Sequence, residues 1–212
     1  MSMTRILIAD DHAVVREGLK QIIAKASDMT VVGEAATGED ALRQAIALDC
    51  DVVVLDINLP DVSGLEVLKQ IKSGNPTLAI LVLSVYSEEA YAVRSLRAGG
   101  SGYLAKESTP EQLISAIRKV SLGGKYVSPS LAERLACEMD ADSERAPHQK
   151  LSDREFQVLC LLSSGKTVKE IAAELSLGTP SVSTYRARIL AKMKMKHVAE
   201  LTHYAIRNRL AD

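Results

Sequence analysis

The sequence is poor in large aromatic residues and has no long apolar run. It contains no Trp and a single Phe among 212 residues, so its cores must be built from Leu, Ile, Val, Ala and Met. No apolar stretch approaches the roughly 20 residues of a membrane-spanning helix. The N-terminus enters a predicted strand within a few residues, without the hydrophobic region of a signal peptide. These absences predict a cytoplasmic protein that does not contact a membrane.

Cysteine is also scarce. The three cysteines, Cys50, Cys137 and Cys160, are odd in number and far apart in the sequence. Disulfide frameworks use paired cysteines, and metal sites use closely spaced ones. We therefore expect three reduced residues that form neither a disulfide nor a metal site.

The net charge of −1 hides an uneven distribution. Residues 150–212 contain 11 basic and 6 acidic residues, a net charge of +5, whereas residues 1–149 contain 15 basic and 21 acidic residues, a net charge of −6. A basic segment favours a polyanionic partner, and an acidic one does not. The C-terminal part is therefore the candidate for contact with nucleic acid.

Residues 1–124 alternate apolar strands with helical segments, which predicts an α/β domain with a doubly wound five-stranded parallel sheet of the flavodoxin-like type. Capping boxes at 63–66 and 109–112 mark the starts of two helices. We expect strands near 4–9, 30–35, 51–55, 79–83 and 101–105, and helices near 13–26, 38–48, 64–73, 87–98 and 110–122.

Gly123-Gly124 ends this domain, and residues 125–149 form a predicted linker. The linker begins with a short amphipathic helix, from Ser128 to about Met139, and continues as a polar, flexible tether.

Residues 150–212 have a purely helical pattern, which predicts an all-α helix-turn-helix domain. Capping boxes at 152–155 and 167–170 open its first two helices. We expect Leu177-Gly178 to make the turn and Thr179 to cap the next helix, which runs to about Met195. A final helix is expected at 198–209.

Chemically active side chains follow four of the predicted strands. The first strand ends in Asp10-Asp11, the third in Asp56, the fourth in Ser84 and the fifth in Lys106. The carboxyl ends of parallel strands meet at one rim of an open sheet, where such folds place their ligands. The sequence therefore predicts a rim with three carboxylates, a hydroxyl and an ammonium group.

This set of groups suits a divalent cation and a phosphoryl group. Asp10, Asp11 and Asp56 would repel one another without a cation, and Mg²⁺ prefers carboxylate, carbonyl and water oxygens. The backbone carbonyl of Asn58 can supply a further oxygen. A carboxylate held near the metal ion can carry an aspartyl phosphate, which Lys106 and a hydroxyl donor can then contact.

The same residues resemble a known family. Asp10-Asp11, Asp56 with Pro60, Ser84, and the run from Gly102 to Lys106 are similar to the receiver domain of two-component response regulators. The run 151–159, the run 169–172 and Ser181-Val182 resemble the LuxR-type helix-turn-helix of the NarL/FixJ class.

This resemblance implies a transcription regulator and not an enzyme. It implies that a sensor histidine kinase phosphorylates Asp56. It further implies that Ser84 moves toward the phosphate and that Tyr103 moves inward. We expect these movements to promote a homodimer that binds repeated promoter sequences in double-stranded DNA.

The helix from Thr179 is the expected recognition helix. Val182, Ile189 and Met193 recur at helical spacing and should face the core, which turns the opposite side toward a major groove. Small side chains and Arg188 on that side can contact bases, while flanking basic residues suit phosphates. The predicted DNA contacts are Lys169, Thr179, Ser181, Ser183, Thr184, Arg186, Ala187, Arg188, Lys192 and Lys196.

Two other functions are compatible with parts of this pattern. A phosphohydrolase of the haloacid dehalogenase type also forms an aspartyl phosphate, but it needs a second acid two residues later, where this chain has Asn58. A constitutive DNA-binding protein would not need Asp10, Asp11, Asp56, Ser84 and Lys106 together. Both alternatives therefore account for less of the sequence than a phosphorylation-controlled regulator does.

Overall fold

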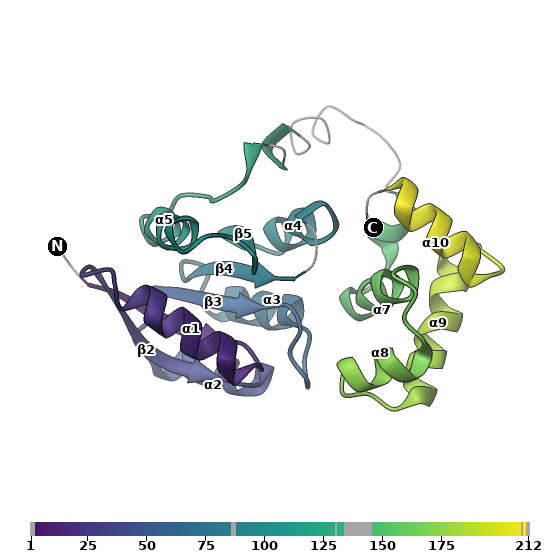
Figure 1. Cartoon of the computed structure of the whole chain (residues 1–212), viewed down its shortest axis with the longest axis horizontal. Helices are drawn as coiled ribbons and strands as arrows, with labels where there is room; N and C mark the ends of the chain where they lie inside the picture. Colours follow the sequence, from purple (N-terminus) through teal and green to yellow (C-terminus); the bar gives the residue numbers. More distant parts are fainter. Residues whose placement is uncertain (1–2, 86–87, 130, 134–145, 209, 211–212) are drawn as a thin grey trace. The chain divides into compact units, whose positions relative to one another are not determined.

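The computed structural model describes residues 3–85, 88–129, 131–133, 146–208 and 210, and the chain divides into two compact units (Figure 1). The first comprises Met1–Glu133 and the second Arg134–Asp212. Each unit has its own core, so each is described separately.

The first unit is a five-stranded parallel sheet with helices on both faces, as the sequence predicts. Its strand order, β2-β1-β3-β4-β5, is the flavodoxin-like order of doubly wound sheets. The strands are β1 (Thr4–Ala9), β2 (Met29–Ala35), β3 (Val52–Asp56), β4 (Ala79–Ser84) and β5 (Gly102–Ala105). The helices are α1 (Ala13–Ile23), α2 (Gly38–Ala47), α3 (Gly64–Gly74), α4 (Glu88–Arg97) and α5 (Pro110–Ser121).

Apolar residues bury both faces of the central strands. Side chains alternate between the faces of a strand, and β3 is buried along its whole length. On one face, Ile6, Ile8, Val52 and Val54 share a core with apolar residues of α1 and α5. Helix α2 contacts β1, α3 contacts β3, and α4 contacts β5. Burial on two faces explains the nearly continuous apolar runs in the sequence.

One predicted helix cap in this unit is wrong. Ser63 precedes α3, but its side chain makes no capping hydrogen bond; its backbone carbonyl instead accepts from Glu66 N at 2.8 Å. Ser63 is buried and still occupies the N-cap position of α3, so the capping pattern identifies the helix start but not the bonding atom. The capping box between Thr109 and Gln112 is confirmed.

The first residues after α5 pack onto the first unit. Gly123 has φ +82°, the left-handed conformation of a residue past a helix end. Tyr126 N donates to Ser101 O at 2.9 Å, and Leu131 is buried. Ser128 caps the start of the predicted linker helix by accepting from Leu131 N at 3.1 Å. The rest of that predicted helix lies outside the described residues.

The second unit is entirely helical within the described residues. It consists of a 3-10 turn, η1 (Pro147–Lys150), and four helices, α7 (Asp153–Ser163), α8 (Val168–Glu174), α9 (Thr179–Met193) and α10 (Val198–Arg207). The η1 turn replaces the end of the predicted flexible tether, because His148 Nδ1 lies 2.8 Å from the hydroxyl of Tyr204 in α10. Capping boxes open α7 and α8 as predicted.

The turn before α9 differs from the prediction. Ser176 takes the left-handed conformation, with φ 51°, whereas Gly178 has an ordinary φ of −74°. Gly178 occupies the cap position without a side-chain bond, and its carbonyl accepts from Ser181 N at 3.0 Å. Thr179 is already inside the helix, so the predicted Thr179 cap is wrong. Helix α9 ends at Met193, and the C-cap residue Lys194 also has a positive φ of 56°.

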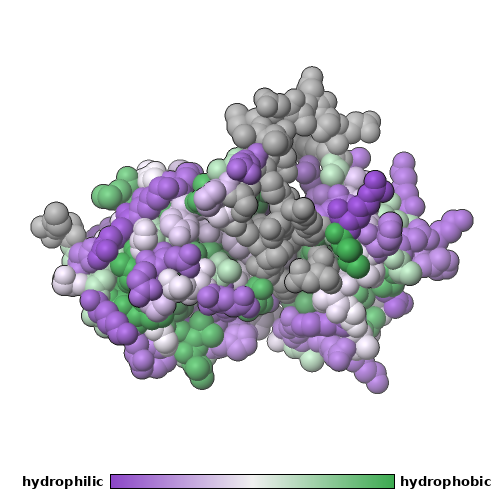
Figure 2. Space-filling model, turned by 45° about the horizontal axis from the view of Figure 1, so that its top comes forward, coloured by the Kyte–Doolittle hydropathy of each residue, from purple (hydrophilic) through white to green (hydrophobic). Residues whose placement is uncertain are grey.

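The described helices include none that combines the length and apolar character needed to cross a membrane. On the face seen in Figure 2, hydrophilic side chains cover much of the coloured surface of both units, and apolar side chains form separate patches among them. The described cysteines, Cys50 and Cys160, are free. Cys137 lies outside the described residues.

Candidate functional site

The ends of β1, β3, β4 and β5 bring the predicted rim residues together. The register pairs Ala9 with Leu55, so that Asp10 and Asp56 leave the sheet side by side. Ser84 pairs with Ala105, and Lys106 N donates to Ser84 O at 2.8 Å, which extends the strand pairing by one residue. The parallel sheet therefore assembles the site through its register.

Lys106 connects the two buried carboxylates. Its Nζ lies 2.7 Å from Asp56 Oδ2 and 2.6 Å from Asp10 Oδ2. Asp10 and Asp56 are only 1% and 2% exposed, so both carboxylates depend on this one ammonium group for charge compensation within the described residues. One positive charge against two buried negative charges leaves room for a further cation.

Burial and charge change the acidity of these groups. Burial raises the pKa of Asp56 to about 6, and the negative charge of Asp10 acts in the same direction, while Lys106 and the backbone of Asn58 oppose it. Burial alone would lower the pKa of Lys106, but the carboxylates of Asp56 and Asp10 outweigh burial and raise it. The site therefore favours the charged form of Lys106, and it favours the neutral form of Asp56 more than water does.

The donor set fits a hard divalent cation. Asp10, Asp11, His12 and Asp56 each place a ligand atom within 4.8 Å of the others. Asp56 Oδ1 is buried and, among the described residues, no group meets it with hydrogen-bond geometry. An unpartnered buried carboxylate oxygen beside a second carboxylate is the environment that an oxygen-seeking cation satisfies.

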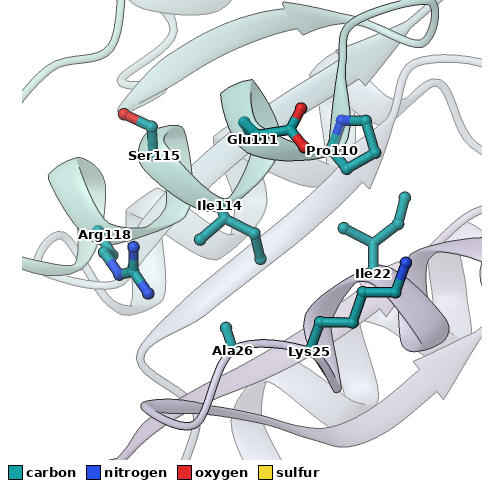
Figure 3. A pocket seen from close by; sticks show the side chains of 8 residues that line it. All are labelled: Ile22, Lys25, Ala26, Pro110, Glu111, Ile114, Ser115 and Arg118. Carbon is teal, nitrogen blue, oxygen red and sulfur yellow. The ribbon is translucent and has the colours of Figure 1, made fainter.

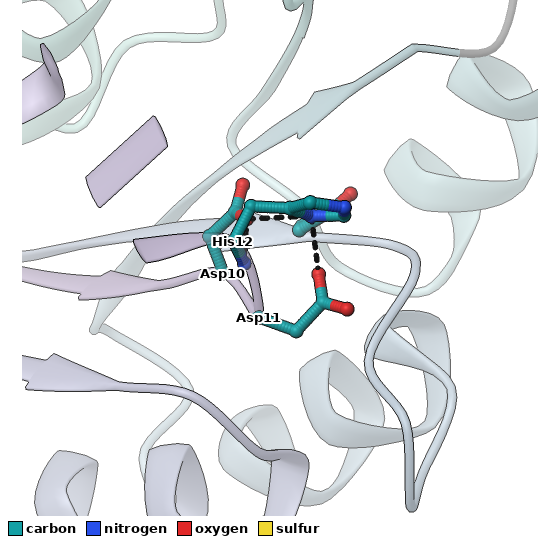
Figure 4. A group of neighbouring side chains, drawn as sticks. Asp10, Asp11 and His12 are labelled. Atoms are coloured by element: carbon teal, nitrogen blue, oxygen red, sulfur yellow. Dashed lines mark hydrogen bonds and ion pairs between the residues drawn. The ribbon is translucent and has the colours of Figure 1, made fainter. Parts of the chain in front are cut away.

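His12 belongs to this cluster, although the sequence reasoning did not include it. Its Nδ1 lies 2.7 Å from Asp11 Oδ1 and 3.4 Å from Asp10 Oδ1 (Figure 4). Its backbone N donates to Asp10 Oδ1 at 2.8 Å. The position directly after two acidic residues at a strand end was the signal that could have identified it.

Arg16 and Gly64 hold the loops that carry the acidic residues. Arg16 Nη1 donates to the backbone carbonyl of Asp10 at 2.8 Å. A Cβ on Gly64 would lie 2.0 Å from the carbonyl oxygen of Asp56, so only glycine allows α3 to start this close to β3.

The two predicted switch residues are buried. Ser84 is 0% exposed at the end of β4, and Tyr103 is 1% exposed on the edge strand β5. The Tyr103 ring is therefore already inside the protein. A movement that turns it outward would have to open the packing around β5.

Two hollows in the first unit lie away from this rim. One, of about 360 Å³, lies between the end of α1 and α5, and its lining includes the apolar Ile22, Ala26 and Ile114 and the charged Lys25, Glu111 and Arg118 (Figure 3). Another, of about 420 Å³, lies between α2 and α3. Neither contains a residue of the acidic cluster.

The predicted recognition helix presents a polar surface opposite its core side. Val182, Ile189 and Met193 are buried as predicted. The predicted DNA contacts that are exposed are Lys169, Thr179, Ser181, Thr184, Ala187, Arg188, Lys192 and Lys196, whereas Ser183 and Arg186 are partly buried.

Two of these side chains already have partners within the protein. The Thr184 hydroxyl donates to Pro180 O at 2.9 Å, so toward DNA it offers only an acceptor and a methyl group. Lys192 Nζ lies 2.6 Å from Glu155 Oε2 in α7.

Comparisons with known proteins cover both units. Residues 6–118 match the response regulator receiver domain family, and residues 149–205 match the bacterial regulatory proteins of the luxR family. The chain is 35% identical to response regulator UvrY of Escherichia coli O6:H1 over 99% of its own length and 97% of that protein. It is 34% identical to response regulator GacA of Pseudomonas aeruginosa over 99% of both chains.

Solved structures extend this similarity. RcsB of Salmonella enterica serovar Typhimurium, bound to the promoter rprA in the presence of phosphomimetic BeF₃⁻, matches with a TM-score of 0.64 at 25% identity. The match covers 95% of this chain and 98% of that one. A LuxR-family response regulator from Aurantimonas sp. SI85-9A1 matches 66% of this chain, and all of its own, with a TM-score of 0.61 at 34% identity.

Proposed function

Because the chain belongs to the two-component response regulators, with a receiver domain followed by a LuxR-type DNA-binding domain, we propose that phosphorylation of Asp56 controls its binding to promoter DNA. The observation that carries this proposal is the geometry around Asp56. Its buried carboxylate shares one lysine with Asp10 and keeps Oδ1 without a partner among the described residues.

Asp56 acts as the nucleophile toward phosphorus. A carboxylate oxygen of Asp56 forms a bond to the phosphorus of a phosphohistidine on a sensor kinase, while the bond from phosphorus to the histidine nitrogen breaks. Lys106 Nζ lies 2.7 Å from Asp56 Oδ2. It is therefore placed to donate a hydrogen bond to a negatively charged phosphate oxygen once Asp56 carries the phosphoryl group. The Ser84 hydroxyl, on the neighbouring strand, is the candidate donor to another phosphate oxygen.

Mg²⁺ is the cation that this set of donors favours. The carboxylates of Asp10, Asp11 and Asp56 and the backbone carbonyl of Asn58 would bind the ion. The bound Mg²⁺ would neutralise negative charge on the phosphoryl group. His12 is close enough to orient Asp11. These residues also explain why phosphorylation should fail without a divalent cation.

The phosphate is read out through Ser84 and Tyr103. Attraction of Ser84 toward the phosphate would alter the packing between the end of β4 and the edge strand β5, which carries Tyr103. We propose that this change exposes a surface on β5 and α4 that pairs two receivers. A few kcal/mol of differential stability suffices for such a shift.

The second unit binds double-stranded DNA through α9. RcsB, which this chain resembles along almost its whole length, has been solved on promoter DNA. The net charge of +5 on residues 150–212 and the exposed basic residues of α9 support the same role here. A single domain of this size has limited contact area, so two copies on repeated half-sites should be needed.

The cytoplasm is the compartment that fits these partners, because a kinase transmitter and promoter DNA both lie there in bacteria. Asn58, where a dehalogenase-type phosphohydrolase needs a second acid, supports regulation and not turnover as the use of the aspartyl phosphate.

Labelling by a small phosphodonor tests the acceptor. Incubation with acetyl phosphate and Mg²⁺ should add one base-labile phosphate per chain, detected by intact-mass spectrometry. Asp56→Asn should abolish the added mass, and so should a chelator. Full labelling of Asp56→Asn would contradict the assignment. Arg43→Gln, which removes an exposed charge away from the rim, serves as the matched control and should label normally.

A further inference from the structure

The recognition helix is attached to α7 by a buried carboxylate. Glu155 is on the first turn of α7 and is 3% exposed. Its Oε2 accepts from Lys192 Nζ at 2.6 Å and from Ser152 N at 2.8 Å. The same side chain therefore closes the capping box of α7 and binds the last turn of α9.

The charge on Lys192 is committed to this contact. A carboxylate removed from water needs a partner, and Lys192 supplies a cation 2.6 Å from it. The Lys192 side chain is 45% exposed and that of Glu155 is 4% exposed, so the lysine reaches inward from a helix surface to a buried acceptor. Moving Lys192 out to a DNA phosphate would leave Glu155 buried at the α7 N-terminus without this cation.

Apolar contacts also attach α9 to the rest of its unit. Val182, Ile189 and Met193 bury apolar surface, and apolar contacts allow small rotations and shifts of a helix at little cost. Base recognition requires the opposite, because hydrogen bonds to base edges depend on positions held to a fraction of an ångström. A short ion pair at one end of the helix supplies a directional constraint of this kind.

We propose that Glu155 and Lys192 form a positioning pair that fixes α9 for base recognition, and that Lys192 is not a phosphate contact. This inference rests on the proposed binding of DNA by α9. For Lys192, the positioning role replaces the phosphate contact that its charge and its place beside the recognition surface suggest.

The two roles predict different losses. A phosphate-binding lysine contributes equally to every sequence, and its removal lowers the salt dependence of binding by about one phosphate contact. A positioning lysine contributes mainly to the preferred sequence, since base contacts need the aligned helix, and its removal leaves the salt dependence unchanged. Substitution of Glu155 distinguishes the two roles further. If Lys192 binds a phosphate, removing the negative charge of Glu155 should release the lysine and strengthen DNA binding.

The experiment compares full-length variants on two duplexes. One duplex is selected from a random pool by the wild-type protein, and the other is a shuffled sequence of the same composition. The variants are Lys192→Gln, Glu155→Gln, the double variant, and Lys192→Arg, which keeps the charge. Lys196→Gln is the matched control, because Lys196 is an exposed lysine near the same end of α9. Affinity is measured across salt concentrations, and circular dichroism follows thermal unfolding.

We expect Lys192→Gln and Glu155→Gln each to weaken binding to the selected duplex about tenfold, a loss typical of one recognition contact, with little change on the shuffled duplex and no change in salt slope. The double variant should lose no more than either single variant, and Lys192→Arg should retain most of the preference. Lys196→Gln should weaken both duplexes equally and reduce the slope by about one contact.

Contrary results are equally clear. If Lys192→Gln behaves as Lys196→Gln does, or if Glu155→Gln binds the selected duplex more tightly, Lys192 is a phosphate contact and the inference is wrong. If the Gln variants do not fold, loss of preference in the folded Lys192→Arg protein with a reduced salt slope overturns it too. A wild-type protein that selects no duplex would instead refute the proposed function.

Discussion

At the residue scale, Asp56 combines burial with a negative charge that Lys106 and the backbone of Asn58 partly compensate. A raised carboxyl pKa means that the folded protein holds the proton more tightly than the unfolded chain does. Stability should therefore fall as the pH rises from about 4 to the pKa of about 6. The unliganded receiver should thus be destabilised at neutral pH by the same charge that the proposed attack of Asp56 on phosphorus requires.

Asp56→Asn should accordingly stabilise the metal-free protein at pH 8. The gain should be about 1–3 kcal/mol, because one pKa unit corresponds to about 1.4 kcal/mol, and it should shrink toward zero at pH 4. Urea unfolding with chelator present measures it. Mg²⁺ should stabilise the wild-type protein and reduce the difference. A destabilised Asp56→Asn protein at pH 8 would contradict this picture of the site.

Asp61 offers a control of opposite sign. Burial alone would raise the pKa of Asp61, but the N–H groups of Glu39 and Gly38, at 2.9 and 2.7 Å, hold it below the usual value. Its contribution to stability is present at neutral pH and lost as the pH falls through the lowered pKa. Asp61→Asn should therefore destabilise the receiver at pH 8 and approach the wild-type protein in acid.

Lys106→Ala should separate phosphorylation from its consequence. The variant keeps the carboxylates, so it should still accept phosphate slowly from acetyl phosphate with Mg²⁺. It lacks the ammonium group that contacts Asp56 and Asp10, so the phosphate should no longer alter DNA affinity. Parallel mass spectrometry and DNA titration test both parts. A phosphorylated Lys106→Ala protein with a normal gain in affinity would remove Lys106 from the switch.

The sequence predicted the rim residues because their position follows from strand order alone. Asp10, Asp56, Ser84 and Lys106 each follow an apolar run, and parallel strands bring such ends together. It did not predict the partner of Lys192, because contact with Glu155 depends on how α9 packs across α7. A lysine on a helix surface looks the same in a sequence whether it faces a phosphate or a carboxylate.

At the scale of elements, the capping patterns in the sequence predicted the starts of three helices correctly. Thr109, Ser152 and Thr167 each cap a helix whose third residue can return the bond. Ser63 has the same sequence spacing and precedes α3, but its side chain makes no capping hydrogen bond. Capping patterns therefore locate helix starts well, although they do not determine which atom makes the bond.

The turn before α9 provides a prediction at this scale. Ser176 has φ 51°, a conformation that costs residues with a side chain roughly 1 kcal/mol relative to Gly. Ser176→Gly should raise the unfolding free energy of the helix-turn-helix unit by about 0.5–1 kcal/mol, because that strain disappears. Scanning calorimetry of the full chain measures the shift.

Gly165 is the matched control for this substitution. It has φ +85° after α7, and a Cβ there would meet no atom within 4 Å, so Gly165→Ala changes only the backbone strain. It should lower the unfolding free energy by about 1 kcal/mol. Equal and unchanged transitions for both variants would show that neither turn is strained.

At the scale of the whole molecule, two self-contained units connect a chemical event to DNA. The second unit has its own caps and its own buried core, which includes Phe156, Ile171 and Leu201. Residues 146–212 should therefore fold alone and bind duplex DNA in a salt-sensitive way. A folded fragment that binds no duplex would contradict the role assigned to α9.

Pairing of receivers is the proposed link between the units. Sedimentation of the full chain should shift toward a dimer when acetyl phosphate and Mg²⁺ are present, and Asp56→Asn should remain as it is without phosphodonor. The change is expected because phosphate at Asp56 would, on the proposed readout, alter the β4–β5 edge that carries Ser84 and Tyr103. Identical profiles in both conditions would exclude dimerisation as the output.

The most direct test of the account is the affinity for a selected promoter duplex, measured with and without acetyl phosphate in the presence of Mg²⁺. The account predicts that phosphodonor tightens binding by the wild-type protein about tenfold or more, which is about 1.4 kcal/mol of coupling. It predicts no effect on Asp56→Asn. Equal affinity of the wild-type protein in both conditions, with Asp56 shown to be phosphorylated, would contradict the claim that this phosphate controls DNA binding.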